Sequence, residues 1–116
     1  MSKKRKRHGK SILQRGEYAE RCYLCMYLND NYAVRRDMET HHVMFGAGRR
    51  DKSEADGLTV RLCREHHQAV HSDGHLRRIL CAIAQRAWER EHQEQYGSAV
   101  RQRWMERYGR NYQEEW

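Results

Sequence analysis

Four side chains of the kinds that bind metal ions lie within nine residues of one another, and this cluster constrains the fold more than any other feature. They are Cys63, His66, His67 and His71. In residues 58–62, just before them, apolar side chains stand at alternate positions, which is typical of a strand. The pattern therefore predicts a short strand that runs directly into a helix bearing metal ligands.

The spacing of these ligands divides them between two sites. His67 and His71 are four positions apart, so on a helix they lie on one face and can bind the same ion. His66 is rotated by about 100° from His67, because a helix has about 3.6 residues per turn. Cys63 and His66 have the spacing of a zinc knuckle instead. The sequence thus predicts two metal sites that share one helix.

The partners of the knuckle stand upstream. Cys22 and Cys25 form a CxxC pair whose thiolates can bind one ion together with Cys63 and His66. We predict a structural zinc site of the Cys3His type, since four protein ligands leave no position open for a substrate. Unrelated buried cysteines are the alternative. The fourth cysteine, Cys81, lies on the apolar side of a predicted helix and is expected to be a small core residue.

Two neighbouring histidines, His41 and His42, lie in residues 32–44, which are predicted to contain a second strand. Side chains alternate across a strand, so the two imidazoles are expected to face opposite sides unless the strand ends there. One could then bind a metal ion while the other transfers protons. A structural or incidental pair is the alternative, and only the downstream cluster favours the chemical interpretation.

Composition indicates a small domain that depends on metal for stability. The chain has 116 residues, a hydrophobic content of 38% and a single Phe, so the core is expected to be thin and to need a bound metal ion or a disulfide for stability. No apolar run has the length of a membrane span or a signal peptide, so we expect a cytoplasmic protein that does not bind membranes. In that compartment, four cysteines mixed with eight histidines favour metal ligation over disulfides.

The net charge of +7 is concentrated in the first ten residues, which hold six of the 23 basic side chains and no acid. We expect residues 1–11 to form a disordered basic arm in which Lys3, Lys4 and Arg5 contact phosphates. A solubilising leader is the alternative.

A second group of cations follows two glycines in residues 44–57, a segment whose composition predicts a loop. Arg49, Arg50 and Lys52 could approach a phosphate there, although a merely solvated loop is the alternative. Further along, apolar residues at helical spacing predict a helix from about 75 to 95 and another over 98–108. Gly109 is expected to end the second helix.

Taken in order, the CxxC pair, the histidine pair and the cluster at 63–71 resemble the HNH nucleases, also called ββα-metal or His-Me finger endonucleases. The resemblance is closest to small phage and prophage HNH proteins with a zinc knuckle, and it covers about residues 20–75. It implies a small α+β fold. A ββα-metal core with a Cys3His zinc knuckle would occupy residues 12–75, and a helical extension over 76–116 would pack on it.

The resemblance also implies roles for individual residues. His41, His67 and His71 would hold a catalytic divalent ion, which in this family can be magnesium, manganese, nickel or zinc. His42 would be the general base that activates water. In the structural zinc site, His66 would replace a cysteine that is common in relatives.

The chain departs from the family at Leu58, where relatives carry an Asn that braces the loop bearing the base. Asp56 and Thr59 are candidates to replace this Asn through side-chain to backbone hydrogen bonds. A reduced or lost activity is the other consequence that this departure allows.

The implied function is hydrolysis of phosphodiester bonds in double-stranded DNA, leaving 5′-phosphate and 3′-hydroxyl ends. The chemistry fits, because a neutral imidazole with a pKa of about 6.5 accepts a proton near pH 7, and three His ligands leave coordination positions open. The resemblance places the protein in the bacterial host of a phage or prophage. A phage packaging or recombination protein is a candidate partner.

Two other functions were weighed against the nuclease. The HxxxH pattern of His67 and His71 occurs in zinc proteases, but here no Glu follows the first His, so the general base is missing. A non-catalytic zinc module that binds nucleic acid or a phage protein would need only the Cys3His site and basic patches. Such a module has no use for His41, His42, His67 and His71, and the number of metal ions bound per chain separates the two hypotheses.

Overall fold

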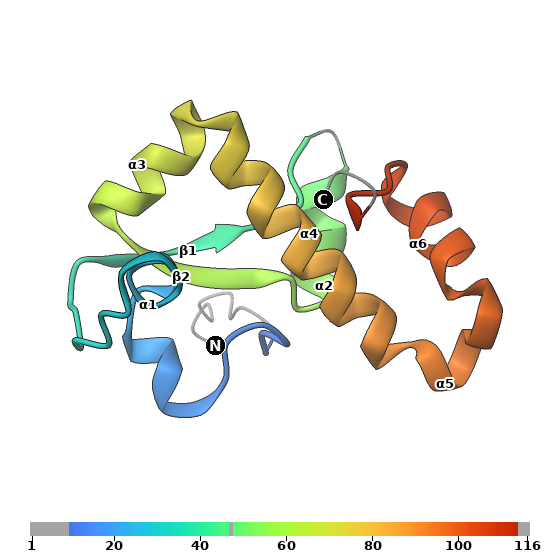
Figure 1. Ribbon diagram of the computed structural model, residues 1–116, viewed down its shortest axis with the longest axis horizontal. Coiled ribbons are helices and arrows are strands. Elements are labelled where there is room, and N and C mark those ends of the chain that lie inside the picture. Colours follow the sequence, from blue (N-terminus) through green and yellow to red (C-terminus); the bar gives the residue numbers. More distant parts are fainter. Residues whose placement is uncertain (1–9, 47, 114–116) are drawn as a thin grey trace, which may run out of the picture.

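A computed structural model describes residues 10–46 and 48–113 of the chain (Figure 1). Its sheet has two antiparallel strands, β1 (Met38–His42) and β2 (Thr59–Cys63), with His41 opposite Val60 in the register. Helices make up most of the remainder, so the predicted small α+β fold is confirmed at that level. The basic side chains of Lys3, Lys4 and Arg5 fall outside the described residues.

Strand β2 runs into helix α3 (Arg64–Ser72) without a loop, as the sequence predicted. Cys63 is the last residue of the strand and also the residue that precedes the helix, where its backbone is still extended, with ψ at 165°. The hydrogen bonding of both elements therefore fixes the position of this ligand. Helix α3 stops at Ser72, because the Asp73 side chain accepts hydrogen bonds from the first amides of the next helix.

The first cysteines lie where the N-terminal segment becomes helical. A 3-10 helix, η1 (Gly16–Glu20), precedes helix α1 (Tyr23–Asn29). Cys22 caps α1, and its Sγ accepts a hydrogen bond from the backbone N–H of Cys25 at 3.4 Å. This cap places both thiols of the CxxC pair on the first turn.

The segment between the strands corrects one prediction. It forms helix α2 (Arg49–Ala55) where composition indicated a loop over residues 44–57. Its glycines stand at the borders of the helix, with Gly48 at φ 77° before it and Gly57 at φ 74° after it. Gly57 also has no room for a side chain, since a Cβ there would lie 2.5 Å from the carbonyl oxygen of Lys10.

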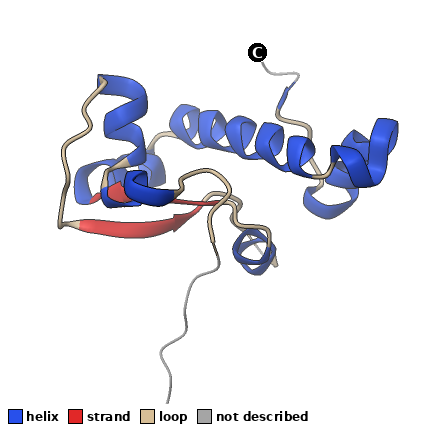
Figure 2. Ribbon diagram, turned by 90° about the horizontal axis from the view of Figure 1, so that it is seen from below, coloured by secondary structure: helices blue, strands red, loops and turns tan. Residues whose placement is uncertain are grey.

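The C-terminal part consists of α4 (Gly74–Glu91), α5 (Gln93–Tyr96), the 3-10 helix η2 (Gly97–Ala99) and α6 (Val100–Tyr108). The single helix predicted from 75 to 95 is thus interrupted at His92, whereas Gly109 ends α6 as expected. Figure 2 shows α4 running past the sheet and carrying the last helices beyond its end.

One partly buried carboxylate ties these helices back to α2. The two Asp56 oxygens accept hydrogen bonds from the indole of Trp88 (3.0 Å), the guanidinium of Arg107 (2.6 and 3.0 Å) and the hydroxyl of Tyr108 (2.6 Å). Four groups that would each be costly to bury alone satisfy one another. Asp56 is one of the two candidates to replace the missing Asn, and the side-chain hydrogen bonds described for it lead to α4 and α6 instead.

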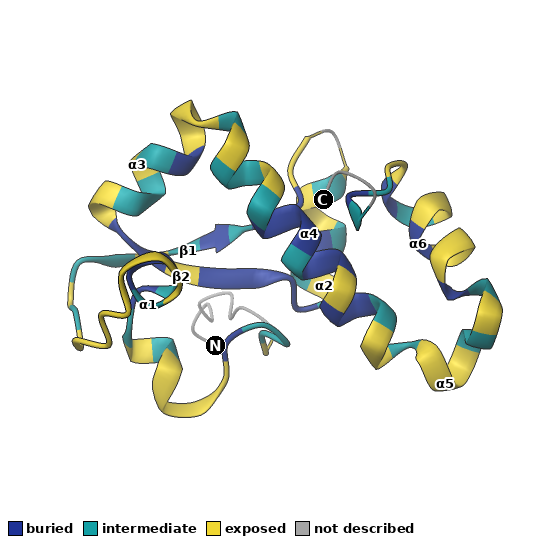
Figure 3. Cartoon of the chain, in the orientation of Figure 1, coloured by how far each residue is buried: buried dark blue, intermediate teal, exposed yellow. Residues whose placement is uncertain are grey.

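The core is thin and lies where β2 meets α3 and α4 (Figure 3). Leu58, Val60, Leu62, Val70 and Leu80 are at most 1% exposed. Cys81 is buried among them as predicted, and burial raises the pKa of its thiol to about 11. Within the part of the chain that the structure describes, no helix combines the length and apolarity needed to cross a membrane.

Candidate metal centres and active site

Cys22 and Cys25 meet Cys63 and His66 at the junction of α1, β2 and α3, where their ligand atoms all lie within 4.8 Å of one another. The three sulfur atoms lie 3.4, 3.5 and 3.5 Å from the Nδ1 of His66, and the sulfurs of Cys25 and Cys63 are 4.0 Å apart. Around a tetrahedral zinc ion, these separations would be about 3.5–3.6 Å for S to N and about 3.8 Å for S to S. The four residues are positioned to hold a metal ion, consistent with structural zinc.

The raised pKa values of the buried thiols mean that a positively charged metal ion is needed to stabilise their thiolate forms. Burial, with the neighbouring Cys22 thiol, raises the pKa of Cys25 to about 12, and burial also raises the pKa of Cys63. Both thiols are therefore protonated at pH 7 without an ion, and zinc binding must displace those protons.

Arg35 supplies a compensating charge that the sequence did not reveal. Its Nη1 lies 3.8 Å from the Sγ of Cys25, while Nη2 pairs with Asp37 at 2.8 Å and with Glu65 at 3.5 Å. A zinc ion with three thiolates and one imidazole has a net charge of about −1. The guanidinium offsets that charge and donates to a ligand sulfur, as the groups around metal ligands commonly do.

The second cluster brings His41 from β1 against His67 and His71 from α3. Their candidate ligand atoms also lie within 4.8 Å of one another. The ring centroids are 5.4 Å apart for His41 and His67, 5.9 Å for His41 and His71, and 4.9 Å for the two helix residues. The strand histidine and the helical pair are therefore close enough to share one ion.

The surroundings of His41 and His67 bear on how each could bind a metal ion. Burial, reinforced by His67, His71 and His42, lowers the pKa of His41 to about 4, so its ring is uncharged at pH 7. The Nδ1 of His67 lies 2.5 Å from Oε1 of Glu39. When it donates its proton there, Nε2 keeps the lone pair for a metal. A set of nitrogen ligands suits zinc or nickel better than magnesium or manganese, which prefer oxygen.

His42 opens onto the same pocket as this cluster, because β1 ends at that residue. The pocket has a volume of about 310 Å³, and Phe45, Arg50 and Arg77 also line it. The Nε2 of His42 lies 2.6 Å from Oε1 of Glu54, a carboxylate from α2. The imidazole is thus held by a negative partner at the edge of a site that can take an ion and an anionic substrate.

No family model, curated protein or solved structure compared with the chain matches it. Its function must be argued from its own residues.

Ser53, which the sequence did not single out, braces the loop that carries His42. Its buried hydroxyl donates to the carbonyl of Leu58 (2.6 Å) and accepts from the N–H of Met44 (3.2 Å). Its own carbonyl accepts from the N–H of Leu58 at 2.8 Å. Ser53 therefore joins the end of β1 to the start of β2. Thr59 was the other candidate to replace the missing Asn. Its backbone carbonyl accepts a hydrogen bond from the hydroxyl of Ser11 at 2.6 Å.

The basic residues predicted to contact phosphates have different surroundings. Arg50 lines the histidine pocket, as a phosphate contact would require. Lys52 instead donates to the carbonyl of Arg107 at 3.1 Å, and Arg49 reaches the backbone near Gly109. Arg77 donates to the carbonyls at the end of α3 and stands over the ring of Phe45, 5.7 Å from its centroid.

Proposed function

We propose that the protein is a metal-dependent endonuclease of the HNH, or ββα-metal, type, and that its substrate is double-stranded DNA. The observation that carries the proposal is the meeting of His41 with His67 and His71 in a pocket that also contains His42. Three neutral nitrogen ligands would leave coordination positions open for a phosphate and a water molecule.

A divalent ion held by His41, His67 and His71 would stabilise the negative charge that develops on the phosphate and on the leaving oxygen. The protein's own part in the chemistry falls to His42. With its Nε2 proton donated to Glu54, the imidazole carries its lone pair on Nδ1 and can accept a proton from water there. The carboxylate also stabilises the imidazolium that results.

Arg50 and Arg77 would contribute to substrate binding, because both line the pocket and carry positive charge. The Cys3His site would be structural. It joins α1 to the junction of β2 and α3, and it therefore fixes the helix on which His67 and His71 stand. DNA would approach the pocket, and a phage packaging or recombination protein is the further partner that we propose.

The proposal is tested by nicking of supercoiled plasmid with the zinc-loaded chain in the presence of manganese, nickel, magnesium or added zinc. The wild type should nick with at least one of these ions. His42→Ala should lower the rate by about 10² to 10⁴-fold, the usual contribution of a general base, without losing zinc from the knuckle. His75→Ala, on α4 and not among the residues lining the pocket, is the matched control. Equal nicking by wild type and His42→Ala would contradict the proposal.

A second function is favoured by the knuckle alone. A non-catalytic zinc module that binds nucleic acid or a phage protein would also use the Cys3His cluster. This function assigns no role to the histidine cluster, and such a module would bind one metal ion per chain.

A further inference from the structure

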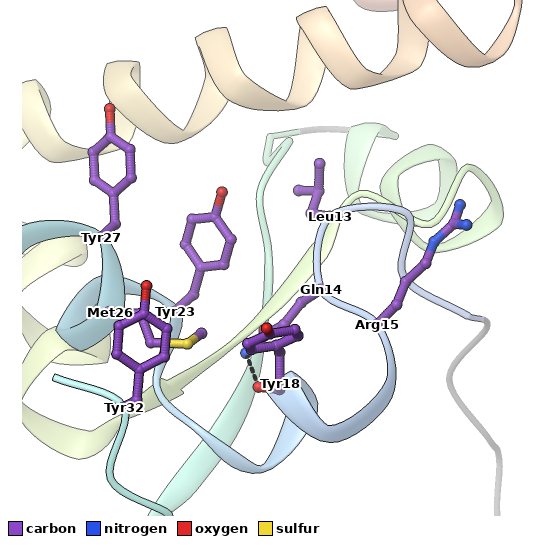
Figure 4. Close-up of a pocket in the computed structure, with 8 residues that line it drawn as sticks. All are labelled: Leu13, Gln14, Arg15, Tyr18, Tyr23, Met26, Tyr27 and Tyr32. Atoms are coloured by element: carbon purple, nitrogen blue, oxygen red, sulfur yellow. Dashed lines mark hydrogen bonds between the residues drawn. The ribbon is translucent and has the colours of Figure 1, made fainter. Parts of the chain in front are cut away.

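A second pocket, which we call the tyrosine pocket, is lined by residues of the segment before η1, of η1, of α1 and of the loop after α1 (Figure 4). It shares no lining residue with the histidine pocket. Its volume is about 300 Å³. Its lining includes Leu13, Arg15, Tyr18, Tyr23, Tyr27 and Tyr32. Four of the seven tyrosines in the chain thus gather at one site.

Tyr23 packs against the core, but the other three rings are largely exposed. Tyr18, Tyr27 and Tyr32 are 48%, 56% and 50% exposed. They form two pairs, since Tyr18 stands edge-on to Tyr32 at 6.5 Å, whereas Tyr23 and Tyr27 are nearly parallel at 6.3 Å. Exposed aromatic side chains gathered around a hollow are typical of binding sites, because they offer large apolar faces at a small cost in side-chain entropy.

The floor of the pocket is rigid, so the site is formed before a ligand arrives. The buried amide of Gln14 donates to the carbonyls of Tyr18 and Arg21, both at 2.7 Å, and its oxygen accepts from the N–H of Arg61 at 2.7 Å. These bonds fasten the segment before α1 to strand β2. The cap at Cys22 holds the helix that carries Tyr23 and Tyr27. Preorganisation of this kind lowers the cost of binding.

Cations lie at the pocket and beside it. Arg15 lines the tyrosine pocket, where it forms an exposed ion pair with Glu91 at 3.4 Å, and it also lines a neighbouring hollow of about 520 Å³, which Lys10 lines as well. A further hollow in contact with Gln14 is lined by Arg61. An aromatic pocket with the cations Arg15 and Lys10 close by suits a ligand with flat apolar faces and a negatively charged backbone.

We propose that the tyrosine pocket binds unpaired nucleotides of single-stranded DNA. Bases would stack on the exposed tyrosine rings, and the backbone phosphates would lie toward Arg15 and Lys10. The choice of DNA as the nucleic acid rests on the proposed nuclease function and deepens it: the enzyme would act where single-stranded DNA adjoins a duplex. A fully paired duplex offers no free base faces, so it should not use this pocket.

The test is fluorescence anisotropy of a labelled oligothymidylate with the zinc-loaded full chain carrying His42→Ala, without added divalent ions. Stacking contributes about 1–3 kcal/mol per base, so Tyr27→Ala or Tyr32→Ala should weaken binding by about 5- to 150-fold. Tyr27→Phe and Tyr32→Phe keep the ring and should bind within about twofold of the unsubstituted protein. Leu28→Ala is the matched control, because Leu28 is 45% exposed on α1, the helix that carries Tyr27, but does not line the pocket.

Unchanged affinity in Tyr27→Ala and Tyr32→Ala would overturn the proposal. So would an equal loss of affinity for a duplex of the same length, or displacement of the oligonucleotide by a proline-rich peptide, the other ligand class that aromatic grooves bind. Tyrosine-dependent binding without any plasmid nicking by the wild type would support the pocket and count against the nuclease. Nicking that survives while the tyrosine variants bind normally would count against the pocket alone.

Discussion

His42 and Glu54 face each other across the loop between the strands, with 2.6 Å between Nε2 of the imidazole and Oε1 of the carboxylate. The contact joins the last residue of β1 to the last turn of α2, and it fixes both the orientation of the ring and the nitrogen that carries the proton.

Glu54 should therefore be a positioning residue for the proposed base. Glu54→Ala is expected to slow nicking by about 10-fold or more, though by less than the 10² to 10⁴-fold expected for loss of the base itself. Glu54→Gln retains a hydrogen-bonding oxygen without the charge, so its nicking rate should lie between the rates of Glu54→Ala and wild type. The measurement is the rate of plasmid nicking by each variant and by the wild type, with both metal sites occupied to the same extent. Wild-type rates in Glu54→Ala would mean that the contact does not orient His42.

Ser53→Ala should destabilise the fold, because it leaves the buried N–H of Met44 and carbonyl of Leu58 without their side-chain partner. The expected loss in the free energy of unfolding is about 1–3 kcal/mol, measured by urea denaturation of the zinc-loaded protein. The control is Ser72→Ala at the exposed end of α3, which should stay within about 0.5 kcal/mol. Equal stabilities for the two variants would remove Ser53 as the brace of the loop.

Cys22→Ala should unfold the domain, since zinc binding and folding are coupled in small metal-dependent folds. Circular dichroism together with zinc content would record both losses. Cys81→Ala removes a buried thiol outside the cluster and should keep one zinc ion per chain. Normal folding of Cys22→Ala without zinc would show that the knuckle does not stabilise the structure.

The pKa of His41 predicts how stability depends on pH before the second ion binds. Burial lowers this pKa to about 4, whereas an unfolded chain has a value of about 6.5. Between these values the unfolded chain binds the extra proton, so this contribution to stability falls as pH drops from 6.5 toward 4. The stability difference between wild type and His41→Ala should narrow between pH 7 and pH 5. A difference that stays constant over that range would contradict the assignment of a neutral buried His41.

The sequence predicts which side chains come together where local spacing determines their geometry. The CxxC spacing was enough to group Cys22 and Cys25, and the period of a helix was enough to group His67 and His71. The strand leading into α3 was likewise predicted from alternation alone. Such features depend on neighbouring residues rather than on the packing of distant segments.

The parts that sequence reasoning missed depend on tertiary contacts. Ser53, Glu54 and Arg35 act through partners that only folding brings near, and no short pattern marks them. Asp56 was one of two candidates to brace the loop, whereas the partners described for its side chain lie 32 to 52 residues further along the chain. The predicted loop at 44–57 failed for another reason, because its glycines cap a helix instead of filling a loop.

The most direct measurement is a calorimetric titration of the zinc-loaded protein with manganese or nickel, repeated with His67→Ala and with His75→Ala as the control. We expect one further divalent site per chain, retained in His75→Ala and lost in His67→Ala while the knuckle zinc stays bound. A protein that holds its single zinc ion and takes up no second divalent ion would contradict the nuclease and leave the non-catalytic zinc module in its place.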